Sequence, residues 1–201
     1  MLKPSNPLAA APLRVMILDD DVERSRNLRG ALSMAGYLVV GELRESIDLE
    51  EAVRGLAPDM IIVAADSPDR DTLEHIGLTT RNAPRPVIMF TQDDDSDTIR
   101  AAVRSGVSAY IVDGLTPERI RPILEVACAQ FDSHQALAER LADTERELAE
   151  RKVVDKAKGL LMSRRGLSEA EAHKELRNLA MQTGKRLGEV AETLVAAAHL
   201  L

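Results

Sequence analysis

Residues 14–21 read RVMILDDD, and this stretch decides the fold of the first part of the chain. Arg14–Leu18 is a short, mostly apolar run, which is typical of a strand buried inside a sheet. Asp19, Asp20 and Asp21 follow it directly. Acidic side chains in tandem repel one another, and a hard divalent cation such as Mg²⁺ is their usual compensation. The stretch therefore predicts a buried strand with a polar site at its carboxyl end.

The same alternation of apolar runs and helical patterns continues for about 100 residues. Strands are predicted at Leu38–Gly41, Met60–Ala64, Val87–Thr91 and Ala109–Val112. Helices are predicted at Val22–Ala35, Leu49–Leu56, Arg70–Thr80 and Ser96–Ser105. Five β–α units with continuous apolar strands indicate an α/β fold, a parallel sheet covered by helices on both faces. Such sheets place their sites at the carboxyl ends of the strands.

The last third of the chain is predicted to be helical throughout. Pro117 opens a long helix that runs to about Arg165, with apolar residues at steps of four and three in two competing registers. These apolar residues line one side of the helix. They form either the seam of a coiled coil, which would make a homodimer through residues 130–150, or a face that packs within the monomer. Ser168 and Glu171 make a capping box for a second helix, which Gly184 ends, and a third helix covers about Gly188–His199. The three pieces form a bundle too small for an ordinary enzyme.

Charge is distributed unevenly along the 201 residues. The net charge is −7, yet residues 151–190 hold ten basic and five acidic side chains, so this segment carries +5 and the remainder −12. An acidic body with a basic C-terminal segment predicts a segregated site for a polyanion. Aromatic residues make up only 2% of the chain, with no Trp, which argues against nucleic-acid binding on aromatic stacking platforms.

Composition also indicates the compartment. Cys128 is the only cysteine, which excludes an intrachain disulfide and a cysteine-based metal site and fits a reducing cytoplasm. No apolar run is long enough to cross a bilayer. Residues 1–13 are rich in Ala and Pro without a strong basic start, so we interpret them as a disordered tail and not as a signal peptide. We expect a cytoplasmic protein.

The strand ends of residues 14–129 resemble the receiver domain of two-component response regulators, which has a flavodoxin-like (βα)5 fold. In that family an acidic pair after the first strand holds Mg²⁺, which Asp19 and Asp20 match, and a Thr or Ser after the fourth strand contacts the phosphoryl group, which Thr91 matches. The phosphate-accepting Asp and the Lys after the fifth strand fall at Ala64 and Asp113. A methyl group cannot accept phosphate, and Asp113 adds negative charge where positive charge is needed. The resemblance therefore implies a receiver-like domain without its phosphorylation chemistry.

Two parts of the phosphorylation chemistry could persist in this chain: an alternative phosphate acceptor and residual Mg²⁺ binding. Asp66 shares side-chain parity with Ala64 and is a candidate stand-in acceptor, although Asp66-Ser67-Pro68 is more typical of a turn. Asp19 and Asp20 retain carboxylates for residual Mg²⁺, but an acidic rim or a partner surface is the interpretation we favour. No other cofactor is expected.

Residues 137–201 resemble an ANTAR domain, the RNA-binding module of AmiR- and NasT-type antitermination regulators. The resemblance rests on 151–162 (RKVVDKAKGLLM), 167–173 (LSEAEAH), 176–181 (LRNLAM) and 187–191 (LGEVA). Residues 66–74 and the Val-Asp-Gly at 112–114 are similar to the NasT branch, which normally keeps an Asp at position 64. Nine basic residues are the candidate RNA contacts: Arg151, Lys152, Lys156, Lys158, Arg165, Lys174, Arg177, Lys185 and Arg186.

The resemblance implies a transcription antiterminator that binds paired hairpins in a leader RNA. In the NasT branch a partner protein that senses nitrate or nitrite holds the regulator inactive, so the expected targets are nitrate and nitrite assimilation genes. Membrane and DNA partners are not expected. A DNA-binding response regulator is one alternative, although residues after Gly184 are too apolar and acidic for a recognition helix. A protein-interaction switch that binds no RNA is the other. No nucleophile–base pair or phosphate loop suggests an enzyme.

Overall fold

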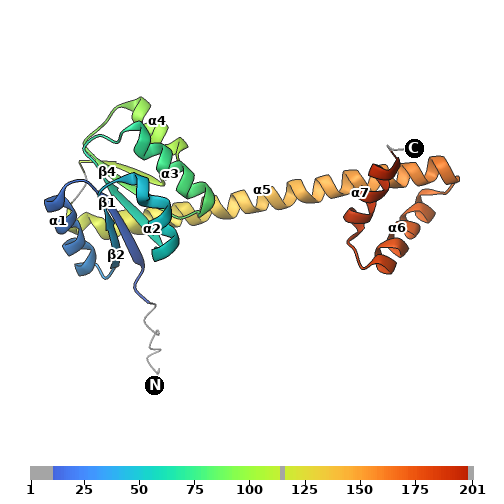
Figure 1. Cartoon of the computed structure of the whole chain (residues 1–201), viewed down its shortest axis with the longest axis horizontal. Helices are drawn as coiled ribbons and strands as arrows, with labels where there is room; N and C mark the ends of the chain where they lie inside the picture. The colour runs from blue at the N-terminus through green and yellow to red at the C-terminus, as the bar shows by residue number, and fades with distance from the viewer. Residues whose placement is uncertain (1–10, 114–115, 199–201) are drawn as a thin grey trace, which may run out of the picture. The chain divides into compact units, whose positions relative to one another are not determined.

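The computed structural model describes residues 11–113 and 116–198 (Figure 1). It divides into two compact units, one up to His134 and one from Gln135 onward, which are described separately below. Of the predicted N-terminal tail, residues 1–10 lie outside the described ranges. Leu13 accepts a backbone hydrogen bond from Leu38 at 2.9 Å. The tail therefore meets the sheet one residue before its first strand.

The first unit contains a parallel sheet of five strands in the order β2-β1-β3-β4-β5, as the apolar runs predict. The strands are β1 (Arg14–Asp19), β2 (Leu38–Leu43), β3 (Met60–Ala64), β4 (Val87–Thr91) and β5 (Ala109–Val112). Asp19 pairs in register with Ala64, Ala64 with Phe90, and Thr91 with Val112. The carboxyl ends of four strands therefore lie side by side and form one rim.

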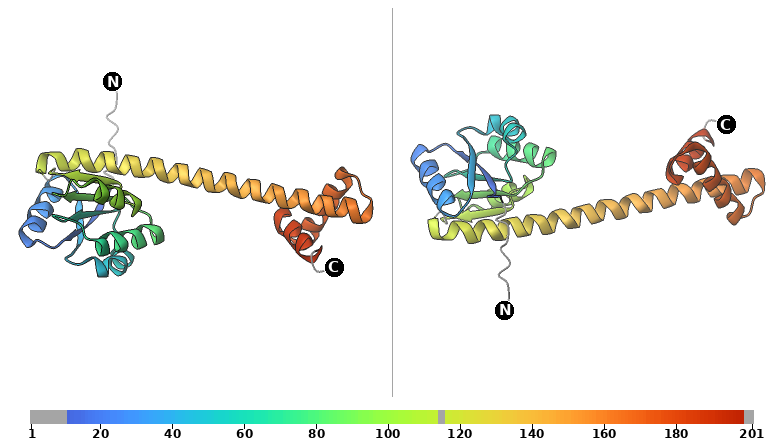
Figure 2. Two further views of the ribbon diagram at one scale, coloured as in Figure 1. Left: turned by 90° about the horizontal axis from the view of Figure 1, so that it is seen from above. Right: turned by 90° about the horizontal axis from the view of Figure 1, so that it is seen from below.

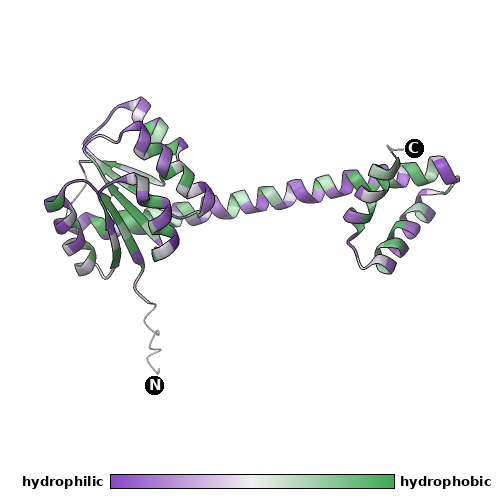
Figure 3. Cartoon of the chain, in the orientation of Figure 1, coloured by the Kyte–Doolittle hydropathy of each residue, from purple (hydrophilic) through white to green (hydrophobic). Residues whose placement is uncertain are grey.

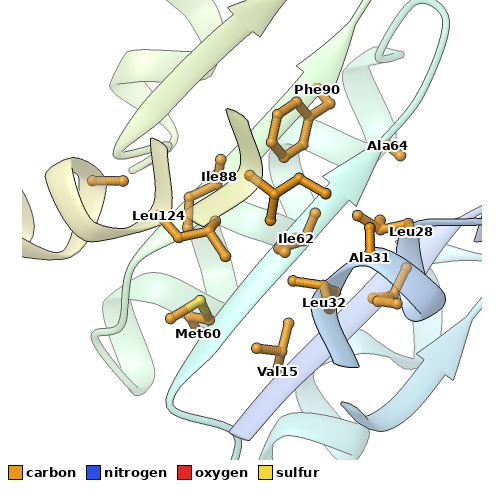
Figure 4. Packing of buried hydrophobic residues seen from close by; sticks show 13 residues of the cluster. Val15, Leu28, Ala31, Leu32, Met60, Ile62, Ala64, Ile88, Phe90 and Leu124 are labelled. Carbon is orange, nitrogen blue, oxygen red and sulfur yellow. The ribbon is translucent and has the colours of Figure 1, made fainter. Parts of the chain in front are cut away.

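Helices cover both faces of this sheet (Figure 2). They are α1 (Val22–Met34), α2 (Leu49–Leu56), α3 (Arg70–Asn82), α4 (Ser96–Arg104) and the first turns of α5 (Pro117–Arg165). One face packs against α1 and α5 through side chains such as Leu28, Leu32 and Leu124, which Figure 4 shows against Val15 and Ile62. The other face packs against α2, α3 and α4. Hydrophobic colour concentrates in the strands of Figure 3 because both faces of the sheet are covered.

Two details of this unit differ from the sequence prediction. Strand β2 continues through Gly41 to Leu43, and a 3₁₀ turn, η1 (Ser46–Asp48), follows it. Gly41 does not end the strand; it makes room for Leu56, whose side chain would collide with a Cβ at this position. The predicted strand, Leu38–Gly41, is therefore two residues too short, and the glycine serves close packing within the strand.

Helix α5 is 49 residues long and contains Pro122, which the prediction of a continuous helix left out of account. Proline removes one helical hydrogen bond and normally kinks or ends a helix. Here Ile120, Leu124 and Ala127 are fully buried against the sheet around it. We infer that this burial offsets the lost hydrogen bond so that the helix continues.

The second unit is a bundle of three helices: the end of α5, α6 (Glu169–Thr183) and α7 (Leu187–Ala198). Its core contains Val154, Ala157, Leu161, Ala172, Leu176, Val190 and Ala191. The predicted capping box is confirmed, because Ser168 and Glu171 cap α6 reciprocally. Gly184, with φ of 64°, ends α6 in the left-handed conformation. His199 of the predicted last helix lies outside the described residues.

Candidate functional site

The rim of the sheet brings the predicted receiver residues of β1 and β3 together. The Asp19 side chain is fully buried at the end of β1, and Ala64 faces it across the strand pair. The Asp19 oxygen Oδ1 accepts a hydrogen bond from the Asp21 backbone N–H at 2.9 Å, whereas Oδ2 is buried without a partner in the described ranges. Burial raises the pKa of Asp19, and the hydrogen bonds from Arg24 and from the Asp21 N–H oppose that shift.

Arg24 lies among these carboxylates and was not predicted. Its Nη2 is 2.9 Å from Asp19 Oδ1 and 2.8 Å from Asp20 Oδ1, its Nη1 donates to the Asp66 carboxylate, and Nη2 also reaches the Ala64 carbonyl oxygen at 3.3 Å. Asp21 caps the N-terminus of α1, so Arg24 stands on the first turn of that helix, four residues after Asp20. That i,i+4 spacing is the sequence signal that could have revealed the contact.

The side chain of Thr91 forms hydrogen bonds with backbone groups at the rim, including that of Asp66. The Thr91 hydroxyl donates to the Asp66 carbonyl at 2.9 Å and accepts from the Asp93 N–H at 3.1 Å. Both functions of the hydroxyl are therefore engaged within the domain. The Asp66 carboxylate lies on the exposed side of the rim and pairs with Arg24.

Asp113 lies at the same rim as Thr91, to whose carbonyl oxygen its backbone N–H donates at 3.1 Å. It follows β5, is exposed, and has a left-handed backbone with φ of 52°, a conformation that Asp tolerates better than most residues. Together with Arg24, Asp66 and Thr91 it lines a shallow cavity of about 220 Å³. Gly114, which completes the predicted motif, lies outside the described residues. No cluster of three or more His, Cys, Asp or Glu side chains in the described ranges is arranged to hold a metal ion.

The second predicted site is the outside of the helical bundle. All nine candidate RNA contacts except Lys158 are exposed. Lys152 and Lys156 lie one helical turn apart on the face of α5 opposite its buried residues Val154 and Ala157. Lys174 and Arg177 are exposed on α6, and Lys185 and Arg186 lie between α6 and α7. The bundle therefore presents basic side chains from α5, from α6 and from the loop between α6 and α7.

Two of the nine candidates are already paired with acids. Lys158 Nζ is 2.8 Å from Asp155 Oδ1 and 2.7 Å from Glu169 Oε1. Arg165 pairs with Glu175. The other seven make no ion pair within the part of the chain that the structure describes. Ion pairing thus separates the candidates in a way that the sequence did not.

Ala157 and Gly159 are both small residues of α5, but only Ala157 serves close helix packing. Ala157 is fully buried in the bundle, but a Cβ on Gly159 would meet no atom within 4 Å. Glycine in the middle of a helix is destabilising by about 0.5–1 kcal/mol relative to alanine. The packing of the bundle does not explain this cost, and Gly159 lies one turn beyond Lys156 on the exposed face of α5.

Comparison with known proteins supports both halves of this description. Residues 15–125 match the response regulator receiver domain family. The chain belongs to that family. Residues 142–195 match the ANTAR domain, so this receiver domain is followed by an ANTAR domain in one chain.

Two of the relatives of the chain are named as regulators. It is 29% identical over 187 residues to the transcriptional regulatory protein PdtaR of Mycobacterium tuberculosis, covering 93% of this chain and 91% of that protein. It is 35% identical over 75 residues to the nitrate regulatory protein of Klebsiella oxytoca, covering 37% and 19% of the two chains. These relatives and the ANTAR match support an RNA-binding regulator of antitermination. The combination of a receiver domain and an ANTAR domain is regulatory.

Solved receiver domains share the fold of the first unit. The signal receiver domain of a modulated diguanylate cyclase from Desulfovibrio desulfuricans aligns with a TM-score of 0.55 at 21% identity, over 61% of this chain and 98% of that one. The receiver domain of NarL from Mycobacterium tuberculosis aligns with a TM-score of 0.52 at 21% identity, over 59% and 98%. Among the described helices, none is long and apolar enough to span a membrane.

Proposed function

We propose that this protein binds paired hairpins of a leader RNA through the exposed basic residues of its ANTAR domain, and that this binding prevents a terminator from forming. The observation that carries the proposal is the set of seven exposed basic side chains without ion pairs among the described residues, spread over α5, α6 and the loop between α6 and α7. Such side chains are free to contact phosphates and loop bases without first breaking an internal contact.

Gly159 adds a second observation. Its exposed position beside Lys156 has no packing purpose within the bundle. A glycine at such a point lets a ligand backbone approach the helix closely. We infer that the RNA backbone approaches α5 along Lys152, Lys156 and Gly159.

We further propose that the chain acts as a homodimer through residues 130–150 of α5. All residues from 136 to 152 are exposed, and Leu137, Leu141 and Leu148 are 59%, 61% and 53% exposed. Leucines at spacings of four and seven on one helix suit a two-stranded seam with a second copy, in which Thr144 takes the intervening position. Two ANTAR domains in a dimer match an RNA target with two hairpins.

Control of the protein is proposed to come from a sensor partner and not from phosphorylation. Ala64 stands where the acceptor is expected and Asp113 where a lysine is expected. The similarity to a nitrate regulatory protein supports nitrate and nitrite assimilation genes as targets. Incubation with acetyl phosphate and Mg²⁺ should give no phosphoryl adduct by intact-mass spectrometry, and an adduct on Asp66 would contradict this part.

Transcription in vitro tests the main proposal. The template carries the leader of the protein's own operon ahead of a reporter segment, and the full-length protein should raise the fraction of read-through transcripts. The double variant Lys152→Ala/Lys156→Ala should lose this effect and bind the leader RNA at least tenfold more weakly. The control Arg54→Ala/Arg100→Ala removes the same charge from two exposed, acid-paired arginines of the receiver domain and should behave like the wild type.

A leader with scrambled hairpin loops separates specific from nonspecific binding. Equal affinity for both RNAs would reduce the basic surface to a general polyanion site. No binding to either RNA by a folded full-length protein would favour a protein-interaction switch. Preferential binding to duplex DNA would favour the DNA-binding response regulator.

A further inference from the structure

Arg24 occupies the centre of the acidic rim of the receiver domain. Its guanidinium contacts the carboxylates of Asp19, Asp20 and Asp66 and lies 3.3 Å from the Ala64 carbonyl oxygen. The Arg24 side chain is only 22% exposed. These partners come from β1, from the loop that follows it, and from the segment after β3. One side chain therefore joins two neighbouring strand ends.

The residues of this rim do not fit a Mg²⁺ ion, although receiver domains bind one here. Mg²⁺ requires a compact set of oxygen ligands in near-octahedral geometry. Asp19 and Asp20 each direct an oxygen to Arg24, and the third carboxylate that the family places on β3 is replaced by the methyl group of Ala64. A metal ion that used these two oxygens would have to displace the guanidinium from both aspartates.

We propose that Arg24 is the permanent cation of the rim and takes the place of the metal ion. Asp19 Oδ2 remains buried without a partner in the described residues, so it is the oxygen that a second cation would have to use. The guanidinium already contacts the other oxygen of the same carboxylate and would repel such an ion. The rim is thus held in one arrangement without a ligand.

The inference deepens the proposed lack of phosphorylation control and rests on it in part. The two differ in what restoring an acceptor would do. If Ala64 alone disables the rim, Ala64→Asp should recover Mg²⁺ binding. If Arg24 fills the rim, Ala64→Asp should stay unable to bind Mg²⁺ until Arg24 is also removed.

Isothermal titration of full-length variants with MgCl₂ distinguishes these cases. We expect no detectable Mg²⁺ binding by the wild type or by Ala64→Asp, and a measurable binding isotherm only for Arg24→Met/Ala64→Asp. Equal Mg²⁺ binding by Ala64→Asp and by the double variant would overturn the proposal. So would Mg²⁺ binding by the wild type that Arg24→Met does not tighten.

Thermal unfolding gives a readout that does not depend on the Ala64→Asp variants folding. Arg24→Met leaves three aspartates without their counter-charge, so its midpoint in EDTA should fall by roughly 3 °C or more. Arg26→Met is the matched control, because Arg26 is exposed on the same helix and makes no ion pair in the described ranges. A midpoint for Arg24→Met equal to that of Arg26→Met would contradict the role of Arg24 in holding the rim.

Discussion

The acidic rim of the receiver domain and the basic surface of the ANTAR domain are both clusters of like charge, but they differ in how that charge is compensated. In the rim, Asp19, Asp20 and Asp66 share the guanidinium of Arg24. On the bundle, seven of nine candidate side chains have no acidic partner among the described residues. A like-charge cluster that is neutralised from within stabilises its own domain, whereas an uncompensated one is suited to an external ligand of opposite charge.

The same contrast exists inside the bundle on a smaller scale. Lys158 and Arg165 hold acids of α6, while Lys152 and Lys156 point away from the core. Charge sign alone therefore does not identify the RNA contacts. The predictions below test this distinction, beginning with the largest expected effect.

Removing the scaffold of the basic surface should have the largest effect. Leu176 is buried at the centre of the bundle, and Leu176→Ala should cost about 2–4 kcal/mol in the free energy of unfolding of the ANTAR domain. RNA binding should be lost with the fold, as measured by circular dichroism and gel shift. Met181→Ala, on the same helix but at a residue 79% exposed, should leave the fold intact. Unchanged RNA binding by an unfolded bundle would place the site elsewhere.

Salt concentration should affect RNA binding by the basic surface much more than the stability of the acidic rim. If about four phosphates are contacted, RNA affinity should fall roughly 50-fold when salt rises from about 50 to 200 mM. The unfolding midpoint of the receiver domain should change little over the same range, since Arg24 is only 22% exposed and its partner Asp19 is fully buried. Filter binding and differential scanning calorimetry provide the two measurements. Salt-independent RNA affinity would exclude binding through the basic surface.

Paired and unpaired lysines should respond differently. Lys156→Ala should weaken RNA binding by about tenfold, as expected for a lost phosphate or base contact. Lys158→Ala should weaken it by about twofold or less, because its ammonium group already serves Asp155 and Glu169. Fluorescence anisotropy with labelled leader RNA measures both. The reverse order would show that ion pairing does not select the RNA contacts.

Gly159→Ala should affect stability and binding in opposite directions. The added methyl group meets no atom within the bundle, so the domain should gain about 0.5–1 kcal/mol in its free energy of unfolding. RNA binding should weaken despite that gain, because the methyl group keeps the RNA backbone at a distance. Urea unfolding and anisotropy on one preparation test both effects. Gly55→Ala serves as the control, since Gly55 is a helical glycine of the receiver domain that is equally open.

The smallest effect concerns pH. The Ser168 hydroxyl and N–H hold the pKa of Glu171 below its ordinary value. A carboxyl group whose pKa is lowered by folding stabilises the folded state above its unfolded pKa, and this contribution is lost as pH falls through the folded pKa. The stability of the bundle should therefore decline below about pH 4.5, and Glu171→Gln should flatten that decline. Glu192→Gln, an exposed substitution on α7, should not.

Much of the fold could be predicted from local patterns. Apolar runs such as 60–64 and 87–91 match β3 and β4 in bounds, because a strand buried on both faces must be continuously apolar. The capping box of Ser168 and Glu171 was readable because capping depends on four consecutive residues. Gly41 and Pro122 were misjudged, since their conformations depend on Leu56 in one case and on the sheet beneath α5 in the other.

The residues of the candidate sites also differ in whether local sequence patterns reveal them. Asp19, Asp20, Ala64 and Thr91 could be assigned to one rim because parallel strands end on one edge of a sheet. Only the i,i+4 contact of Arg24 with Asp20 had a signal in the sequence, because the contact with Asp66 joins residues that are 42 positions apart. Likewise Lys158 and Lys156 look equivalent until α6 brings Glu169 to one of them.

The sequence by itself determined the order of the secondary-structure elements, the acidic rim and the basic character of the C-terminal segment, since each depends on residue type and short spacing. Only the tertiary structure decided which charges neutralise each other. Electrostatic pairing requires side chains within about 4 Å, and that proximity arises where strands and helices distant in sequence are packed together. Arg24 is thereby engaged within the receiver domain, while Lys152 and Lys156 remain exposed on the bundle.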